Sequence, residues 1–210
     1  MQYVIFWCII ILVDFMFTIK ENIINEIVIK NSRFITVLYK VKSIEEIDNY
    51  LNEIRNIYKD ATHYCYAYIL NNVKKCSDDG EPSGTAGIPM IQVLEKNNVN
   101  YILCIVIRYF GGIKLGSNGL IRAYSKCVSN ALNNCNMIEL ISGYNVDIIF
   151  SYENLNNINY ILKDNIILNK QFNEEIIYNL DIDKILLDKI ISLNYEVIIN
   201  EEKLIEKNKN

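Results

Sequence analysis

Acidic and hydroxyl side chains stand together in a glycine-rich stretch at residues 77–87. The loop contains Asp78, Asp79, Gly80, Glu81, Ser83, Gly84 and Thr85. Paired acids could hold a divalent cation, or one of them could act as a general base. The acids could instead favour the N-terminus of a following helix, with Ser83 or Thr85 as its N-cap. Because no histidine or further ligand cluster accompanies the acids, we favour capping and loop shaping, and we predict neither a metal site nor a catalytic residue here.

A second glycine-rich loop, at residues 108–122, offers positive rather than negative groups. Its candidate nucleic-acid or anion-binding residues, with one from the helix beyond, are Arg108, Tyr109, Gly111, Gly112, Lys114, Gly116, Arg122 and Lys126. Backbone N–H groups, a helix N-terminus and a lysine could together hold a phosphate, because all present positive potential with little bulk. The spacing matches neither G-x-x-x-x-G-K-[ST] nor G-x-G-x-x-G. Glycines that allow close strand-to-helix packing are the alternative, and both readings stay open.

Aromatic residues and the single histidine add little catalytic chemistry. Tyr109 and Phe110 beside Arg108 could stack on an unpaired base, although aromatic residues at a strand end are more often core. His63 is the only histidine, and we expect it to pack within a strand, since no Ser-His-Asp or Cys-His arrangement can be built around it. Six cysteines without a C-x-x-C pair predict reduced thiols rather than zinc. We expect no cofactor.

Strands and helices must position these loops. Ser43 and Glu46 form a capping-box pattern that begins a helix ending near Lys59. Alternating apolar residues predict two strands joined by a turn at Asn31 and Ser32. The expected elements are strands at 27–29, 34–41, 63–70 and 101–107 and helices at 44–59, 86–96 and 119–135. The apolar run at 101–107 is typical of a strand that is buried on both faces.

The composition changes after Ile141, where we expect a second domain to begin. Its pattern predicts strands at 145–150, 166–172, 174–180 and 195–199 and helices at 153–163 and 182–193. This βαββαβ order is the ferredoxin-like arrangement, and the charged tail from Glu201 is expected to fray. The predicted fold class is α/β (α+β), with an apolar extension at 1–22, an N-terminal domain at 23–140 and a C-terminal domain at 141–205.

The first residues of the chain are strongly apolar at positions 3–13, but Asp14 interrupts them. The run is too short to span a bilayer and lacks the pattern of a secretory signal, so we expect no stable membrane span. Met16 begins a stretch that resembles the ordinary N-terminus of a protein. Residues 1–15 are therefore either untranslated or an interfacial anchor.

Charge is unevenly distributed along the chain. The net charge of −4 argues against coating of nucleic acid by bulk electrostatics. No acidic residue occurs between Glu95 and Glu139, while five basic residues, Lys96, Arg108, Lys114, Arg122 and Lys126, fall there. This segment predicts a local cationic surface, with ordinary scattered surface charge as the alternative.

Four motifs in order resemble one known family. Residues 78–87, DDGEPSGTAG, and residues 107–124, IRYFGGIKLGSNGLIRAY, are similar to the glycine-rich signature of the Impact (YigZ-like) family. Residues 61–68, ATHYCYAY, and 30–35, KNSRFI, resemble two further motifs of that family. Ile107 stands where threonine is usual, and Ser117-Asn118 replaces a small-Gly pair. The second departure concerns the detailed shape of the loop.

The resemblance implies a fold and a cellular setting. It implies an N-terminal domain like domain two of a ribosomal protein, also found in domain four of elongation factor G, and a ferredoxin-like C-terminal domain similar to the last domain of that factor. Eukaryotic relatives restrain a stress-activated translation kinase and carry an additional RWD domain. We expect that domain to be missing here and do not carry the kinase role over. The resemblance implies a cytoplasmic protein without established catalytic residues.

Two functions follow as hypotheses. The first is a translation regulator that binds RNA, the ribosome or translation factors through Arg108, Lys114, Arg122 and Lys126. The alternative is a small-molecule enzyme or sensor for a phosphorylated ligand held between the glycine loops, with the acids of the first loop opposite Lys114. The sequence contains no DNA-specific motif and leaves the oligomeric state open.

Overall fold

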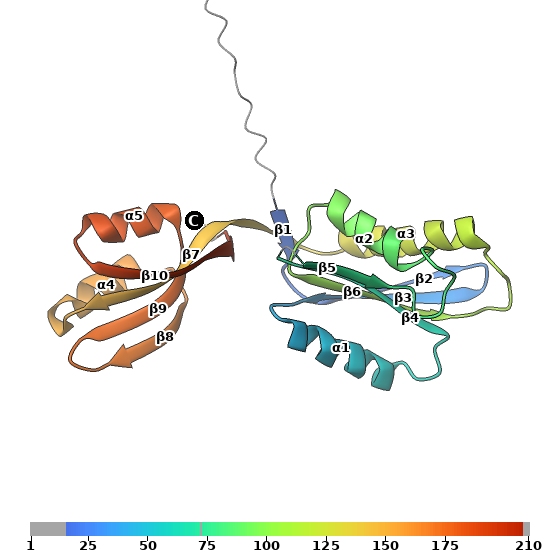
Figure 1. The fold of residues 1–210 in the computed structure, drawn as a ribbon, viewed down its shortest axis with the longest axis horizontal. Helices are drawn as coiled ribbons and strands as arrows, with labels where there is room; N and C mark the ends of the chain where they lie inside the picture. The colour runs from blue at the N-terminus through green and yellow to red at the C-terminus, as the bar shows by residue number, and fades with distance from the viewer. Residues whose placement is uncertain (1–15, 72, 208–210) are drawn as a thin grey trace, which may run out of the picture.

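The computed structural model describes residues 16–71 and 73–207, so the expectations for residues 1–15 lie outside the described residues. The described residues form two five-stranded sheets, each with its own hydrophobic core. The long strand β7 (Met137–Phe150) leads from the first sheet region into the second sheet (Figure 1). The mixed α/β class predicted from the sequence is confirmed.

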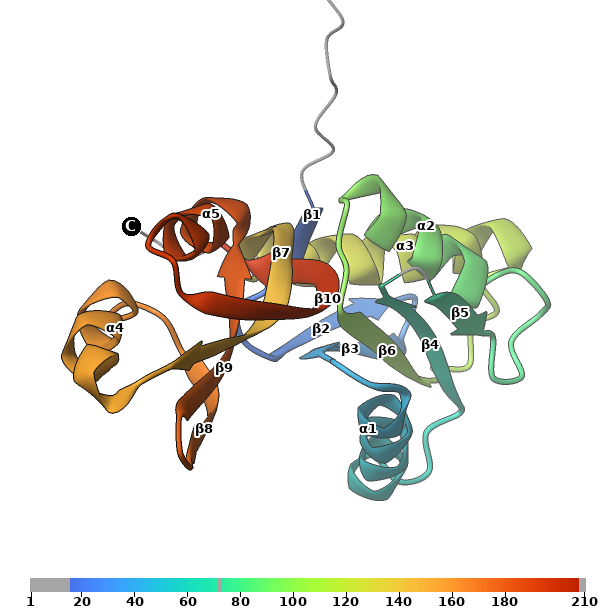
Figure 2. The ribbon, with the colours of Figure 1, turned by 60° about the vertical axis from the view of Figure 1, so that its left-hand side comes forward.

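The first sheet is antiparallel throughout and has the order β2-β3-β6-β4-β5. Its strands are β2 (Ile23–Ile29), β3 (Ser32–Lys40), β4 (His63–Leu70), β5 (Val73–Ser77) and β6 (Ile102–Tyr109). Helix α1 (Ile44–Ile57) covers one face, and α2 (Gly87–Lys96) and α3 (Ser117–Asn133) cover the other (Figures 1 and 2). The loops therefore join a central sheet to helices on both of its faces.

The central strand β6 explains why its sequence is apolar without alternation. Ile102, Cys104 and Val106 pack into the core beneath α2 and α3, while the intervening residues pack beneath α1. Residues Ile102 to Ile107 are completely buried. The predicted strand buried on both faces is confirmed, because helices cover both sides of it.

Local signals set the start of α1 and the first hairpin. The Ser43 hydroxyl accepts from the N–H of Glu46, and the Glu46 carboxylate accepts from the N–H of Lys42, as the capping-box pattern predicted. The hairpin turn is formed by Lys30 and Asn31, both at positive φ. Ser32 already pairs with β2, so the predicted turn is wrong by one residue. Two consecutive positive φ angles match the twist that a two-residue hairpin requires.

The second sheet contains the predicted βαββαβ unit. Its elements are β7, η1 (Tyr152–Asn154), α4 (Leu155–Ile161), β8 (Ile167–Phe172), β9 (Ile176–Asp183), α5 (Lys184–Ser192) and β10 (Glu196–Glu206). The strand order β10-β7-β9-β8 with antiparallel neighbours is ferredoxin-like. Apolar residues of α4 and α5 pack on one face of this sheet.

Backbone pairing extends beyond what side-chain pattern predicted. The expectation that the tail frays from Glu201 is wrong, because β10 continues to Glu206 and pairs with β7 as far as Leu140. Strand β1 (Met16–Ile19) pairs with Met137 to Leu140 of β7, and β5 was not predicted either. These strands are short or rich in charge, so their pairing leaves little hydrophobic signal. No helix in the described ranges combines the length and apolar character needed to cross a bilayer.

Candidate functional site

The two glycine-rich loops meet at one end of the first sheet and form the walls of a cleft. The cleft has a volume of about 440 Å³. Its lining comes from the start of β4, the first loop, the end of β6, the second loop and the start of α3, namely Thr62, His63, Glu81, Pro82, Arg108, Phe110, Lys114, Leu115, Gly116, Ser117 and Leu120. Segments far apart in the sequence are thus brought together around one hollow.

Asp78 shapes the first loop from within. Its carboxylate accepts hydrogen bonds from the backbone N–H groups of Ala86 and Gly87 at 2.9 and 2.8 Å, and from that of Gly84 at 2.8 Å. Burial alone raises the pKa of the Asp78 carboxyl, but these three donors outweigh it and hold the pKa below its ordinary value. The acid therefore satisfies the start of α2 from across the loop.

The loop-shaping interpretation of the acids is borne out by the contacts of Asp78 and Asp79, but the proposed caps are not used. The N-cap position of α2 is Ala86, and the hydroxyl of Thr85 donates to the carbonyl of Pro82 instead. Asp79 accepts from the backbone N–H of Tyr64 and from the guanidinium of Arg55. It thereby fixes the loop to β4 and α1.

Glu81 and Arg108 form a buried ion pair at the floor of the cleft. Their side chains are 3% and 5% exposed, and Nη1 of Arg108 lies 2.5 Å from Oε1 of Glu81. The hydroxyl of Tyr124 donates to the same oxygen at 2.8 Å, and Nη2 of Arg108 lies 3.3 Å from Oγ of Ser32. Nε2 of His63 lies 3.8 Å from Oε2 of Glu81. The carboxylate therefore organises three neighbouring side chains, Arg108, Tyr124 and His63.

Arg108 was predicted to lie on an exposed cationic surface. This prediction is wrong, because Arg108 lies in the interior and is only 4% exposed. It follows Val106 by two residues on β6, so its side chain points to the same buried face. Counting in twos along the strand would have placed it there. The partners Glu81 and Tyr124 are distant in sequence, and no local signal identified them.

The second loop owes its glycines to both close approach and backbone conformation. A Cβ on Gly111 would lie 2.1 Å from the backbone of Asn31, so the loop packs directly against the first hairpin. Gly112 and Gly116 have φ angles of +83° and +71°, which other residues rarely adopt. Gly116 is also the N-cap of α3, and no side chain in the described part of the chain caps this helix.

The aromatic pair at the end of β6 is divided between two surfaces. Tyr109 packs with the core beneath α1, and its hydroxyl donates to the carbonyl of Lys59. Phe110 lines the cleft and is 46% exposed, with its ring centroid 5.5 Å from Cζ of Arg108. Of the two aromatic residues, Phe110 is the one available to a ligand in the cleft.

The exposed cations come from the second loop and from α3. Lys114 lines the cleft, and Arg122 and Lys126 lie exposed one turn apart on α3. None of these three forms an ion pair with a carboxylate of residues 16–71 or 73–207. The structure therefore brings Arg108, Lys114 and Gly116 together at the cleft, and places Arg122 and Lys126 farther along the helix.

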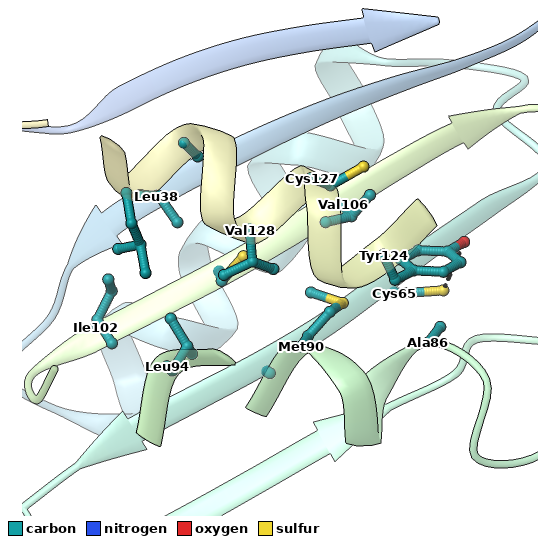
Figure 3. Close-up of a cluster of buried hydrophobic side chains, with 14 of the residues drawn as sticks. Leu38, Cys65, Ala86, Met90, Leu94, Ile102, Val106, Tyr124, Cys127 and Val128 are labelled. Carbon is teal, nitrogen blue, oxygen red and sulfur yellow. Dashed lines mark hydrogen bonds between the residues drawn. The ribbon is translucent and has the colours of Figure 1, made fainter. Parts of the chain in front are cut away.

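Thiols near the cleft are not poised for nucleophilic chemistry. Tyr124 of α3 points toward Cys65 of β4 in the core, with 3.3 Å between Oη and Sγ (Figure 3). Burial raises the pKa of the Cys65 thiol to about 12, so it stays protonated at neutral pH. Within the described ranges, no group of three or more metal-ligating side chains could hold a metal ion.

Known proteins are similar to the part of the chain that contains this site. The sequence pattern of the Impact N-terminal domain matches residues 30–132. The IMPACT family member YvyE of Bacillus subtilis is 48% identical over 126 residues, which are 59% of this chain and 58% of that protein. The IMPACT family member YigZ of Escherichia coli is 41% identical over 109 residues, 50% of this chain and 53% of that protein. The matches thus span little more than half the length of these relatives.

A solved structure extends the similarity beyond the matched domain. The crystal structure of a hypothetical protein is 27% identical and has a TM-score of 0.67, covering 90% of this chain and 98% of that chain. Both sheets therefore have a counterpart of the same fold. Together with the domain match, which includes both glycine-rich loops, these similarities show that the chain belongs to the Impact family.

Proposed function

We propose that this protein is a cytoplasmic RNA-binding protein that associates with the ribosome or translation factors and regulates translation. The observation that carries this proposal is the α3 cationic surface, defined by Lys114, Arg122 and Lys126. These side chains are exposed and make no ion pair with any described carboxylate. Unpaired surface cations on an acidic protein favour a polyanionic partner over general association with acidic proteins.

The distribution of charge supports binding of RNA at one region of the surface rather than over the whole protein. Arg108 is neutralised by Glu81, so it contributes little to attraction at the surface. Lys114, Arg122 and Lys126 lie in a stretch without acidic residues between Glu95 and Glu139. Such a stretch can follow phosphates of structured RNA while the rest of the protein, with its net charge of −4, limits non-specific binding.

Binding to a ribosomal RNA fragment at several salt concentrations tests the proposal. We expect log affinity to fall linearly with log salt, because each neutralised phosphate releases counterions. Arg122→Ala and Lys126→Ala should each reduce the magnitude of the slope by about 0.7–0.9. Lys189→Ala is a matched control, because Lys189 is also exposed on a helix but lies on α5.

Two results would contradict the proposal. One is an affinity for RNA that is absent or independent of salt. The other is a Lys189→Ala variant that loses as much affinity as Arg122→Ala, because binding would then not be located on α3.

A further inference from the structure

We propose that the cleft between the glycine-rich loops binds a phosphate monoester. The phosphate would lie between Lys114 and the N-terminus of α3, with the organic part against the apolar wall of the cleft. Lys114 belongs both to this site and to the α3 cationic surface, whereas Arg122 and Lys126 lie outside the cleft lining, so the site goes beyond the proposed RNA binding. The terminal phosphate of an RNA and the phosphate of a free nucleotide present the same chemistry to it.

The start of α3 supplies unpaired backbone donors. The first N–H groups of a helix have no partner within the helix and carry the positive end of its dipole. In α3, a helix of 17 residues, the N-cap is Gly116 and the first turn contains no acidic residue. Gly116 and Ser117 both line the cleft. The helix therefore directs unsatisfied donors to the hollow, an arrangement that suits phosphate.

Arg108 provides an independent indication that the cleft favours negative charge. Nη1 and Nη2 are used by Glu81 and Ser32, but the buried Nε has no hydrogen-bond partner among residues 16–71 and 73–207. Arg108 is 4% exposed and lines the cleft. Buried donors without a partner are rare in native proteins. Nε itself has almost no accessible surface, so an anion in the cleft would stabilise this buried guanidinium through its charge rather than by accepting a hydrogen bond from Nε.

The balance of charge at the cleft also favours an anion. Glu81 is matched by Arg108, and Lys114 adds a positive charge with no ion-pair partner in the described ranges. Nδ1 of His63 lies 2.9 Å from the carbonyl oxygen of Asp79, which can only accept, so this nitrogen carries a proton.

The remaining lining indicates that the ligand has an organic part. Pro82, Phe110, Leu115 and Leu120 give the cleft apolar walls. Its volume of about 440 Å³ lies within the range of roughly 300–1,000 Å³ that is usual for small-molecule sites. The exposed ring of Phe110 offers a face for a base or another planar group. A nucleoside monophosphate combines these features and serves as the probe.

Calorimetric titration with adenosine 5′-monophosphate, adenosine and inorganic phosphate tests the site. We expect the monophosphate to bind and adenosine to bind at least ten-fold more weakly, because the charged group contributes most of the affinity. Lys114→Ala should weaken monophosphate binding about ten-fold. Lys126→Ala, an exposed lysine of the same helix outside the cleft, should change it less than two-fold.

Ser117→Asp separates loss of binding from loss of folding. An acid in the first turn stabilises a helix, so this exposed substitution should keep or raise the melting temperature. The new carboxylate would occupy the positive end of α3 and repel phosphate, and we expect monophosphate binding to be lost. Equal binding to wild type and Ser117→Asp, or no binding of the monophosphate at millimolar concentration, would overturn the proposal.

RNA substrates distinguish the two sources of the phosphate. If the ligand is an RNA end, a 5′-phosphorylated oligonucleotide should bind at least ten-fold more tightly than its 5′-hydroxyl form, and Ser117→Asp should remove the difference. If the ligand is a free nucleotide, the two oligonucleotides should bind equally while the monophosphate still binds. A circular RNA, which has no end, tests Arg122 and Lys126 alone, so failure of one proposal is distinguishable from failure of the other.

Discussion

The loop end of the first sheet and the open face of the second sheet are both rich in polar groups, but they use them differently. On the second sheet, Asn145, Asp147, Asn179 and Asp181 face away from α4 and α5 and bond to one another. Lys203 completes this network with an ion pair to Asp181 at 3.0 Å. At the loop end, by contrast, Nε of Arg108, Lys114 and the start of α3 have no partner among the described side chains.

This contrast indicates which of the two regions is better suited to bind an anionic ligand. A polar network whose members satisfy one another has little capacity left for a ligand, and it mainly orders the strands. Donors held by a rigid scaffold without acceptors are prepared for an anion, because no internal bond has to break on binding. The open face of the second sheet is also acidic, which disfavours phosphate. We therefore propose that binding takes place at the loop end of the first sheet.

Removing Glu81 is expected to have the largest effect on stability. Glu81→Ala would leave Arg108 as an uncompensated buried charge and should lower the free energy of unfolding by about 3–5 kcal/mol. Urea unfolding followed by circular dichroism measures this loss. The double variant Glu81→Ala with Arg108→Leu should recover much of it, because the charge is removed as well. If the double variant is no more stable than Glu81→Ala, the ion pair is not what supports the floor of the cleft.

Asp78 should give the second largest effect, with a distinctive pH dependence. Asp78→Ala leaves three backbone donors unsatisfied and should cost about 2 kcal/mol. The folded protein lowers the pKa of this carboxyl, so its stabilisation is complete above the unfolded pKa of about 3.9 and is lost as pH falls through the folded value. Unfolding of wild type and Asp78→Asn between about pH 6 and pH 2 measures it.

The expected direction of the pH dependence makes this experiment decisive. The stability advantage of wild type over Asp78→Asn should shrink as the solution is acidified, since protonation removes the charge that the three N–H groups stabilise. A difference that stays constant over the whole range would mean that the carboxylate charge does not hold the first loop.

The sequence predicted those features of the fold that depend on neighbouring residues, but not those that depend on contacts between distant residues. Helical and alternating periodicities predicted the βαββαβ unit, because side-chain burial repeats along each element. A continuous apolar run predicted the doubly buried strand β6, because helices cover both of its faces. Strand β10 beyond Glu201 was missed because backbone pairing with β7 orders it in spite of its charge. The meeting of Glu81 with Arg108 joins residues 27 positions apart, which no periodicity encodes.

The candidate site was predicted in part for the same reason. The glycines and Lys114 were identified from composition, and the structure places Lys114 and Gly116 at the cleft. His63 and Phe110 were considered and set aside as core, although both line the cleft. Tyr124 carried no signal beyond its place on the apolar side of a helix, and its bond to Glu81 depends on the packing of α3 against the sheet.

A substitution in the second sheet is expected to have the smallest effect on the free energy of unfolding, and it tests whether this sheet takes part in binding. Asn179 donates to Asn145 at 3.0 Å and to Asp147 at 2.6 Å, but it is only partly buried, so water can replace these partners. Asn179→Ala should therefore lower the free energy of unfolding by about 1 kcal/mol. Binding of RNA and of adenosine 5′-monophosphate should remain within two-fold of wild type. A larger loss of RNA affinity in Asn179→Ala than in Arg122→Ala would place recognition on the second sheet and reverse the assignment.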